Sequence, residues 1–166
     1  MSETQTITPK KVVIVEDNIA MREIVVHKLT TNGFEVKEAG DGKQGIELII
    51  SEKPDIVLLD LMLPEVDGFQ VLEKIRKDPD QKLANTPIIV LSNLWSNKDI
   101  LKTKALKVQA YLVKAYFTTE EILKKVNDVL ANPSTISDDT GSGPSGASAG
   151  ASVGAPSAAS TPPPAV

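Results

Sequence analysis

Residues 55–64 read DIVLLDLMLP, in which an apolar run ends abruptly in the carboxylate of Asp60 and a loop with Pro64 follows. The run is too short for a typical helix and is rich in branched side chains, so it predicts a buried β-strand. The turn pair Asp67-Gly68 comes after the loop. An acid at the carboxyl end of a buried parallel strand lies where open α/β sheets bind ligands. Asp60 is therefore the first candidate for the chemical centre of the protein.

Four further stretches have the character of strands, and they alternate with helical patterns along the chain. These stretches are residues 11–15, 34–38, 87–91 and 110–113. Residues 34–38 alternate apolar and polar side chains, which predicts an edge strand with one wet side. The helices between the strands begin with capping signals, and the predicted capping residues are Asn18 or Asp17, Asp41, Asp67, Ser96 and Thr118. Five strands alternating with five helices predict an α/β fold, a doubly wound parallel sheet with helices on both faces.

Composition divides the 166 residues into a domain and two flanks. Residues 132–166 contain no aromatic residue, Lys or Arg and consist mostly of Ser, Gly, Ala, Pro and Thr. Such a segment has too little apolar surface to offset its ordering entropy, so we expect a disordered tail. Residues 1–9 are polar and are expected to be flexible. Residues 10–131 remain as one domain with room for a core.

Charge and composition exclude several classes of function. The formal charge is −4, and Asp138 and Asp139 of the tail account for half of it. Because the domain has no basic stripe to hold a phosphate backbone, we expect no nucleic-acid binding by it. The chain contains no cysteine, which excludes disulfides and cysteine zinc sites. It shows neither a signal-peptide core nor an apolar run of the ~20 residues that a membrane helix needs, so we predict a cytoplasmic protein without a membrane partner.

The polar residues that follow the predicted strands are expected to converge. They are Glu16 and Asp17, Asp60, Ser92 and Lys114. In a parallel sheet these strand ends share one edge, and neighbouring strands lie ~4.8 Å apart. Three carboxylates at such short distances repel one another, and a hard divalent cation such as Mg²⁺ relieves this repulsion. A hydroxyl and an ammonium beside them can stabilise a phosphoryl group, so we predict that Asp60 is a nucleophile that forms an acyl phosphate.

Each of these residues also has a plain structural interpretation when it is taken alone. Glu16 and Asp17 can cap a helix, Ser92 can belong to a turn, and Lys114 can be a solvated edge residue. Their occurrence at successive strand ends of one chain favours the functional interpretation.

Two residue types occur once in the chain. His27 is predicted to face solvent, opposite the apolar stripe that Met21, Val25 and Leu29 form with Ile24 beside them. Trp95 is predicted to pack in the loop after Ser92, with the hypothesis that its fluorescence reports a conformational switch.

With these motifs in place, residues 10–131 resemble a response-regulator receiver domain of two-component signalling, of the single-domain, chemotaxis-regulator-like kind. The matching stretches are VVIVEDN at 12–18, DIVLLDLMLP at 55–64, DG at 67–68, PIIVLS at 87–92 and YLVK at 111–114. The resemblance implies a flavodoxin-like fold with five helices and strand order 2-1-3-4-5. It also implies a phosphoacceptor signalling protein, which catalyses its own phosphoryl uptake and loss, in place of an enzyme.

The resemblance implies roles for the acidic residues. Asp60 would receive the phosphoryl group from a phosphohistidine on a sensor histidine kinase or a phosphotransfer protein. Asp17 and Asp60 would bind Mg²⁺ together with the backbone carbonyl of Met62, and Glu16 would help through water.

The resemblance also implies a switch. Lys114 would contact the phosphoryl group, Ser92 would move to hydrogen-bond it, and Tyr111 would follow by turning inward. These movements would change the surface of the fourth helix, fifth strand and fifth helix, which would contact an unknown downstream protein. The family usually has proline after this lysine, whereas this chain has Ala115, and a cis bond before a non-proline residue costs ~3 kcal/mol. We therefore expect a trans peptide bond there.

Three other functions are compatible with parts of the pattern. A phosphatase or phosphotransferase of the haloacid-dehalogenase type requires a second acid two residues after the nucleophile. This chain has Met62 at that position, which argues against such an enzyme. A nucleotide or flavin binder needs a Gly- or Ser/Thr-rich phosphate loop after the first strand, where Glu16 and Asp17 would repel phosphate. A phosphorylation-independent docking module of the same fold is the remaining alternative. If the chain is complete, output is expected from protein–protein contact.

Overall fold

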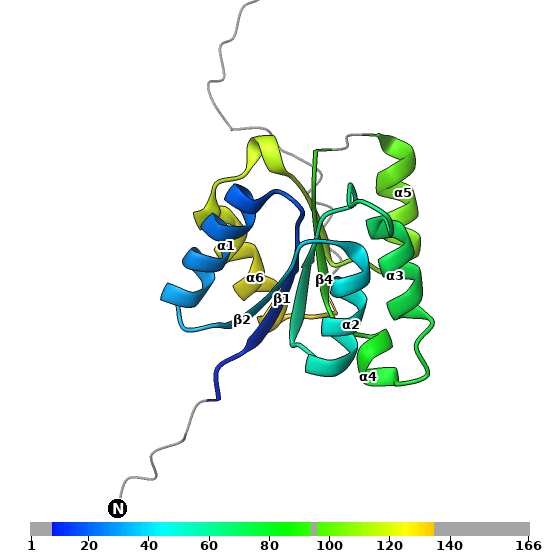
Figure 1. The fold of residues 1–166 in the computed structure, drawn as a ribbon, viewed down its shortest axis with the longest axis horizontal. Coiled ribbons are helices and arrows are strands. Elements are labelled where there is room, and N and C mark those ends of the chain that lie inside the picture. Colours follow the sequence, from blue (N-terminus) through cyan, green and yellow to red (C-terminus); the bar gives the residue numbers. More distant parts are fainter. Residues whose placement is uncertain (1–7, 94–95, 135–166) are drawn as a thin grey trace, which may run out of the picture.

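Residues 8–93 and 96–134 are described by the computed structural model, and within them a five-stranded parallel sheet runs through the molecule (Figure 1). The strands are β1 (Lys11–Val15), β2 (Glu35–Ala39), β3 (Ile56–Leu59), β4 (Ile88–Ser92) and β5 (Ala110–Val113). Their order is β2-β1-β3-β4-β5, and every neighbouring pair is parallel. The predicted fold class and strand order are confirmed, as is the edge position of the alternating strand β2.

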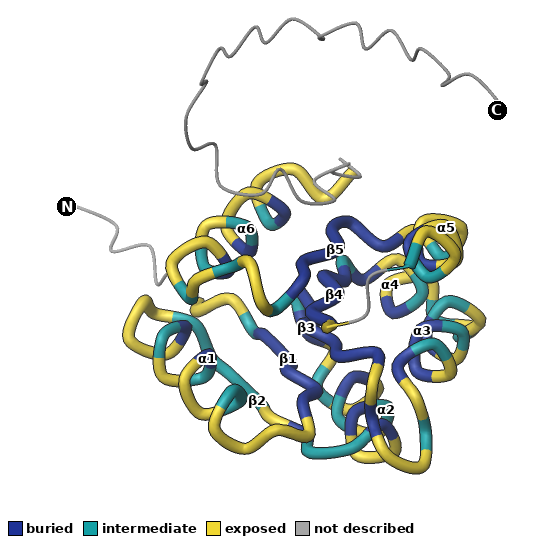
Figure 2. Tube along the Cα trace, turned by 90° about the horizontal axis from the view of Figure 1, so that it is seen from above, coloured by how far each residue is buried: buried dark blue, intermediate teal, exposed yellow. Residues whose placement is uncertain are grey.

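Helices cover both faces of this sheet (Figure 2). The helices are α1 (Ile19–Thr31), α2 (Gly42–Glu52), α3 (Gly68–Arg76), α4 (Gln81–Ala84), α5 (Asn97–Ala105) and α6 (Thr119–Ala131), with a 3-10 turn η1 (Lys114–Tyr116). Helices α1 and α6 pack on one face, and α2, α3, α4 and α5 lie on the other.

Side chains alternate between the two faces along each central strand, which explains why these strands are apolar throughout. In β1, Val12 and Ile14 pack with α1 and α6, whereas Val13 and Val15 pack with the helices on the opposite face. A strand that is buried on both sides has no position for a polar residue until it ends. The first polar side chains after each strand are therefore displayed together at the carboxyl edge of the sheet.

The predicted helix caps are confirmed. The side chains of Asp41, Asp67, Ser96 and Thr118 each accept a hydrogen bond from the backbone N–H three residues on. For α1 the sequence left two candidates, and the structure selects Asn18, whose Oδ1 accepts from the N–H of Met21 at 2.9 Å. Because Asn18 caps the helix, the carboxylate of Asp17 is left to another role.

Two local expectations are wrong. The described residues form six α-helices in place of five, because Gln81–Ala84 forms the extra helix α4 in a segment expected to be a loop. A helix of four residues is too short to show apolar periodicity. Ile24 was expected beside the buried stripe of α1, yet its side chain is 55% exposed, whereas Val25 and Leu29 are buried.

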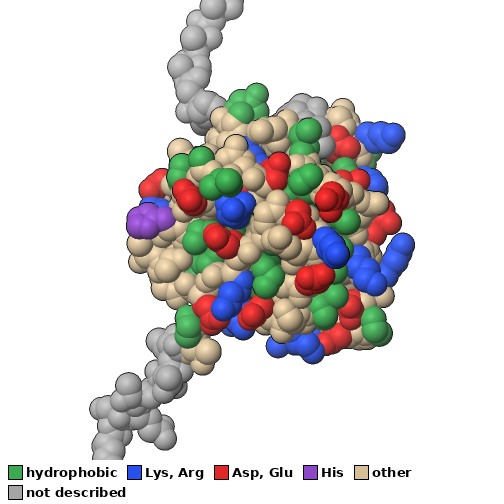
Figure 3. Space-filling view, viewed as in Figure 1, with side chains coloured by type: hydrophobic (Ala, Val, Ile, Leu, Met, Phe, Trp, Pro, Cys, Tyr) green, Lys and Arg blue, Asp and Glu red, His purple; other side chains and the backbone are tan. Residues whose placement is uncertain are grey.

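The surface carries charges of both signs. On the face seen in Figure 3, Lys and Arg side chains are interspersed with Asp and Glu, and the described residues form no continuous basic band there. His27 is exposed, as predicted. None of the helices within residues 8–93 and 96–134 combines the length and the apolar character that crossing a membrane requires. Trp95, residues 1–7 and residues 135–166 lie outside the described residues, so the expectations for them are not tested.

Candidate functional site

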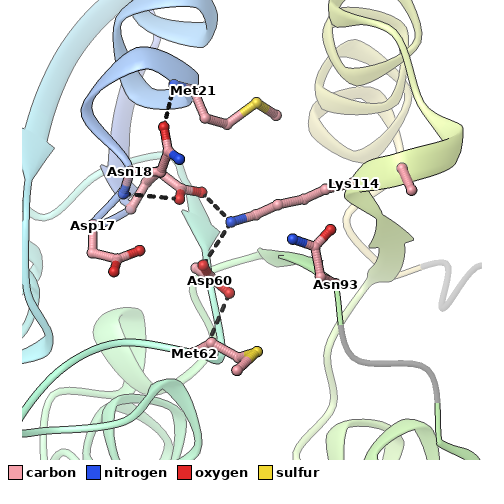
Figure 4. Close-up of a pocket in the computed structure, with 9 residues that line it drawn as sticks. Asp17, Asn18, Met21, Asp60, Met62, Asn93 and Lys114 are labelled. Atoms are coloured by element: carbon pink, nitrogen blue, oxygen red, sulfur yellow. Dashed lines mark hydrogen bonds and ion pairs between the residues drawn. The ribbon is translucent and has the colours of Figure 1, made fainter.

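The strand ends bring the predicted side chains to one pocket at the carboxyl edge of the sheet (Figure 4). Glu16 and Asp17 follow β1, Asp60 follows β3, and Lys114 follows β5. All four line a cavity of about 510 Å³, together with Met62. The convergence expected from the sequence is therefore observed for these residues.

Lys114 joins the two buried carboxylates of this pocket. Its Nζ lies 2.6 Å from Oε2 of Glu16 and 2.6 Å from Oδ2 of Asp60. Burial lowers the pKa of Lys114, but the hydrogen bonds to Asp60 and Glu16 outweigh this effect, and the pKa is raised above its ordinary value. The side chain is thus a fixed cation that partly offsets the repulsion between the two acids.

The three acids differ in exposure. Glu16 is 1% exposed and Asp60 is 4% exposed, whereas Asp17 is open to solvent. Burial raises the pKa of Glu16, and the bonds from Lys114 only partly counter it. One carboxylate oxygen from each of Glu16, Asp17 and Asp60 lies within 4.8 Å of the others. A set of oxygen donors with one solvent-exposed member fits a hard divalent cation that keeps part of its water shell.

The backbone around Asp60 fixes its carboxylate. Its N–H donates to the carbonyl of Val15 in β1 at 2.9 Å, and its Oδ1 accepts from the N–H of Met62 at 2.9 Å. Gly68 at the start of α3 packs directly beneath, because a Cβ at this position would lie 2.3 Å from the carbonyl oxygen of Asp60. The loop between β3 and α3 can therefore close under the acid only with glycine there. The structure places Met62 at the pocket, and the role of its carbonyl stays a prediction.

Ser92 and Tyr111 lie behind the pocket. Ser92 is the last residue of β4 and is fully buried, and it is not among the residues that line the cavity. Tyr111 on β5 is 4% exposed, so this residue is already buried in this structure. Burial raises the pKa of Tyr111, and a hydrogen bond with Ser92 partly offsets this effect. Movement of the two residues on activation stays a prediction.

Some pocket residues were missed. Asn93 lines the cavity where Ser92 was expected, because β4 extends through Ser92 and the first residue beyond the strand is Asn93. Asn18 and Met21 also line it, from the start of α1. The described residues contain no cis peptide bond, so Lys114 is joined to Ala115 by the expected trans bond.

Comparison with known proteins identifies the family. The family model for the response regulator receiver domain matches residues 12–127. The chain belongs to this family. Receiver domains are signalling modules of two-component systems that bind Mg²⁺ at an acidic pocket, and the cluster of Glu16, Asp17 and Asp60 is consistent with that property.

Similar sequences are longer regulators. The chain is 37% identical over 123 residues to a probable transcriptional regulator ycf27 of Guillardia theta, covering 74% of this chain and 46% of that protein. It is 33% identical over 126 residues to the DNA-binding dual master transcriptional regulator RpaA of Synechocystis, covering 76% of this chain and 51% of that protein. The chain with its receiver domain thus spans about half the length of the curated relatives that it matches.

Similar structures are receiver proteins of about the size of the domain. The chemotaxis response regulator CheY4 of Vibrio cholerae superimposes with a TM-score of 0.67 at 30% identity, covering 74% of this chain and 99% of that chain. The phosphorylated cyanobacterial phytochrome response regulator RcpA gives a TM-score of 0.65 at 30% identity, covering 78% and 99%.

Proposed function

We propose that this receiver domain is a phosphoacceptor, in which Asp60 takes a phosphoryl group from a phosphohistidine on a sensor histidine kinase or phosphotransfer protein. The observation that carries the proposal is the setting of the Asp60 carboxylate. It is buried, bonded to Lys114 Nζ on one oxygen and to the N–H of Met62 on the other, and it lies beside Glu16 and Asp17. A carboxylate held in this way is oriented before the donor arrives.

We assign Mg²⁺ to Asp17, Asp60 and the backbone carbonyl of Met62, with Glu16 contributing through water. When bound, the ion neutralises charge on the phosphoryl oxygens. The fit rests on the three carboxylate oxygens that lie within 4.8 Å of one another and on the exposure of Asp17, which leaves one side of the site open to solvent.

The transfer itself requires little covalent work by the protein. An oxygen of the Asp60 carboxylate attacks phosphorus as the bond from phosphorus to the donor imidazole breaks, and the imidazole takes up a proton from solvent. The ammonium of Lys114, which bonds Oδ2 of Asp60 at 2.6 Å, then stabilises a phosphoryl oxygen. When the group is lost to water, a water oxygen attacks phosphorus, the bond from phosphorus to the Asp60 oxygen breaks, and inorganic phosphate leaves from between the same side chains.

We propose that phosphorylation is transmitted through Ser92 and Tyr111 to the surface of α5, β5 and α6. Both side chains are buried, and they lie on the neighbouring strands β4 and β5, which supports this coupling. A shift between two populations of that surface would then alter binding to a downstream protein.

We also propose the extent of the domain, the kind of output and the cellular location of the protein. Residues 10–131 form the domain, and residues 1–9 and 132–166 are its flanks. RpaA is named as a DNA-binding regulator and is about twice as long as the matched region. For this chain we propose output through protein–protein contact and a cytoplasmic location.

Intact-mass measurement tests the proposal. The protein is incubated with Mg²⁺ and acetyl phosphate, in parallel with the variants Asp60→Asn and Asp128→Asn. A single labile phosphoryl adduct is expected on wild type and on Asp128→Asn, whose exposed carboxylate lies on α6 away from the pocket. The adduct is expected to be lost in Asp60→Asn. If wild type binds Mg²⁺ but forms no adduct with any donor, the phosphorylation-independent docking module becomes the better account.

A further inference from the structure

The turn between β1 and α1 carries two of the three pocket carboxylates, and its backbone is held from two sides. The N–H of Glu16 donates to the carbonyl of Ala39 at the end of β2 at 3.0 Å. The carbonyl of Glu16 accepts a hydrogen bond of 2.7 Å from Nη1 of Arg22. The path of the chain into Asp17 therefore depends on β2 and on Arg22.

Arg22 is confined in this position. It lies in the first turns of α1, where its N–H donates to the carbonyl of Asn18 at 2.9 Å, so the helix fixes the base of the side chain. The side chain is only 16% exposed. A Cβ built on Gly40 would lie 3.4 Å from Nη1 of Arg22, which places the guanidinium against the end of β2. The guanidinium has little room for another orientation.

This orientation leaves one N–H of the arginine without a hydrogen bond. Among the buried side-chain nitrogen and oxygen atoms of the described residues, Nε of Arg22 is the one that has no hydrogen-bond partner. The carboxylate of Glu38 is 3.9 Å from Nε, too far for a hydrogen bond. Native proteins satisfy nearly all buried polar groups, so an exception calls for an explanation. Here the side chain satisfies the carbonyl of Glu16 while its own Nε is left without a partner.

We propose that Arg22 is a positioning residue for the acidic turn, which holds Glu16 and Asp17 in the orientation that binds a divalent cation with Asp60. The inference rests on the proposed function and extends it to a residue outside the pocket lining. The hydrogen bond of Arg22 reaches the backbone of the turn, so the residue acts on the carboxylates through the backbone. Groups that orient metal ligands from outside the coordination sphere typically change metal affinity by about 10- to 100-fold.

A purely electrostatic role predicts the opposite sign. A guanidinium near three carboxylates disfavours a second cation, so its removal would tighten Mg²⁺ binding. A positioning role predicts that its removal weakens Mg²⁺ binding. The direction of the change therefore separates the two roles.

The experiment is a calorimetric titration of the full chain with Mg²⁺, using wild type, Arg22→Met, Arg22→Lys and the control Lys28→Met. Lys28 lies on the same helix and pairs with Glu120 of α6, so the control removes one positive charge without touching the turn. We expect the Kd of Arg22→Met to rise by about 10- to 100-fold and that of Arg22→Lys to rise less. The Kd of the control is expected to stay within about twofold of wild type. At saturating Mg²⁺, the control Lys28→Met is expected to reach the wild-type extent of phosphorylation, because its side chain pairs with Glu120 on α6 and does not contact the acidic turn.

An unchanged or lower Kd in Arg22→Met, with native circular dichroism, would overturn the proposal. If Arg22→Met does not fold, Arg22→Lys decides, and an unchanged Kd in this variant would overturn the proposal. The failure of both variants to fold would also overturn the proposal. The proposed function fails separately, when wild type binds Mg²⁺ and is not phosphorylated. In that case the comparison of Kd values still decides the role of Arg22.

Discussion

The ammonium nitrogen of Lys114 lies 2.6 Å from Oδ2 of Asp60, although β4 separates the strands that these residues follow. The same nitrogen lies 2.6 Å from Oε2 of Glu16. One side chain thus crosses a strand to bond two carboxylates that are almost fully buried. This contact stabilises the pocket as it stands, and a phosphoryl group on Asp60 would compete for it.

Replacing Lys114 by methionine tests this balance. Two buried carboxylates lose their cation, so without Mg²⁺ the free energy of unfolding is expected to fall by about 3 kcal/mol. Mg²⁺ is expected to bind more tightly than to wild type and to recover part of the loss, and Asp60 remains available for phosphorylation. Urea unfolding with and without Mg²⁺ measures the effect, with Lys43→Met, an exposed residue of α2, as control. Equal stability of Lys114→Met and wild type without Mg²⁺ would contradict the assigned role.

Gly68→Ala tests the support beneath Asp60. The added Cβ would approach the carbonyl oxygen of Asp60 to 2.3 Å, so the loop must shift and the domain is expected to lose about 1–3 kcal/mol. Phosphorylation is expected to slow because the nucleophile moves with the loop. Gly33→Ala is the matched control: Gly33 has φ +87° and open space around it, so alanine there strains the backbone without touching the pocket. Both variants should be destabilised, and a normal phosphorylation rate in Gly68→Ala would count against the account.

Glu16 gives a prediction for pH. Burial raises its pKa above the ordinary value of 4.5, so the folded state holds this proton more tightly than the unfolded chain. The resulting stabilisation is present below the unfolded-state pKa and is lost as pH rises through the raised folded-state pKa. Because glutamine does not titrate, Glu16→Gln is expected to gain stability relative to wild type as pH rises from 4.5 through the raised folded-state pKa of Glu16. Urea unfolding in the presence of a chelator checks this, and a difference that does not change with pH contradicts it.

Arg76 gives a prediction for stability away from the pocket. Its guanidinium donates to four backbone carbonyls at the ends of α4 and α5, and these acceptors are Ala84, Thr86, Leu106 and Lys107. Burial lowers the pKa of Arg76 to about 10, so it remains charged at neutral pH. Arg76→Met leaves these carbonyls without the donor and is expected to cost about 3 kcal/mol. The neighbouring Lys77→Met, with a side chain that is 76% exposed, is expected to have little effect.

For Arg76→Met, the phosphorylation of the folded fraction should be unchanged, because Arg76 lies at the opposite end of the strands from Asp60. Its acceptor Thr86 precedes β4, whereas Asp60 follows β3. A loss of phosphorylation without a loss of stability would contradict the structural role.

The elements that the sequence predicted correctly depend on local signals. A strand buried on both faces is a continuous apolar run, and a capped helix begins with a short polar residue, so both can be recognised without neighbours. The position of the pocket was predicted from one further rule, that the carboxyl ends of parallel strands lie on the same side of the sheet. That rule places these residues together, because Asp60 and Lys114 directly follow their strands and the first two residues after β1 are Glu16 and Asp17.

The features that escaped prediction depend on contacts between distant segments or on small shifts in boundaries. Arg22 and Arg76 bind backbone carbonyls, which have no signature in side-chain sequence. Asn93 was missed because β4 ends one residue beyond its apolar run, at Ser92. Helix α4 is a single turn that apolar periodicity cannot reveal, and the exposure of Ile24 is decided by which neighbours α1 packs against.

The most direct test of the central claim is to locate the phosphoryl group. Borohydride reduces an acyl phosphate to an alcohol, so a phosphorylated aspartate becomes homoserine that peptide mapping can place. After incubation with Mg²⁺ and acetyl phosphate, we expect homoserine at position 60 and at no other acid. Homoserine at another position, or none while an intact-mass adduct is present, would contradict the account.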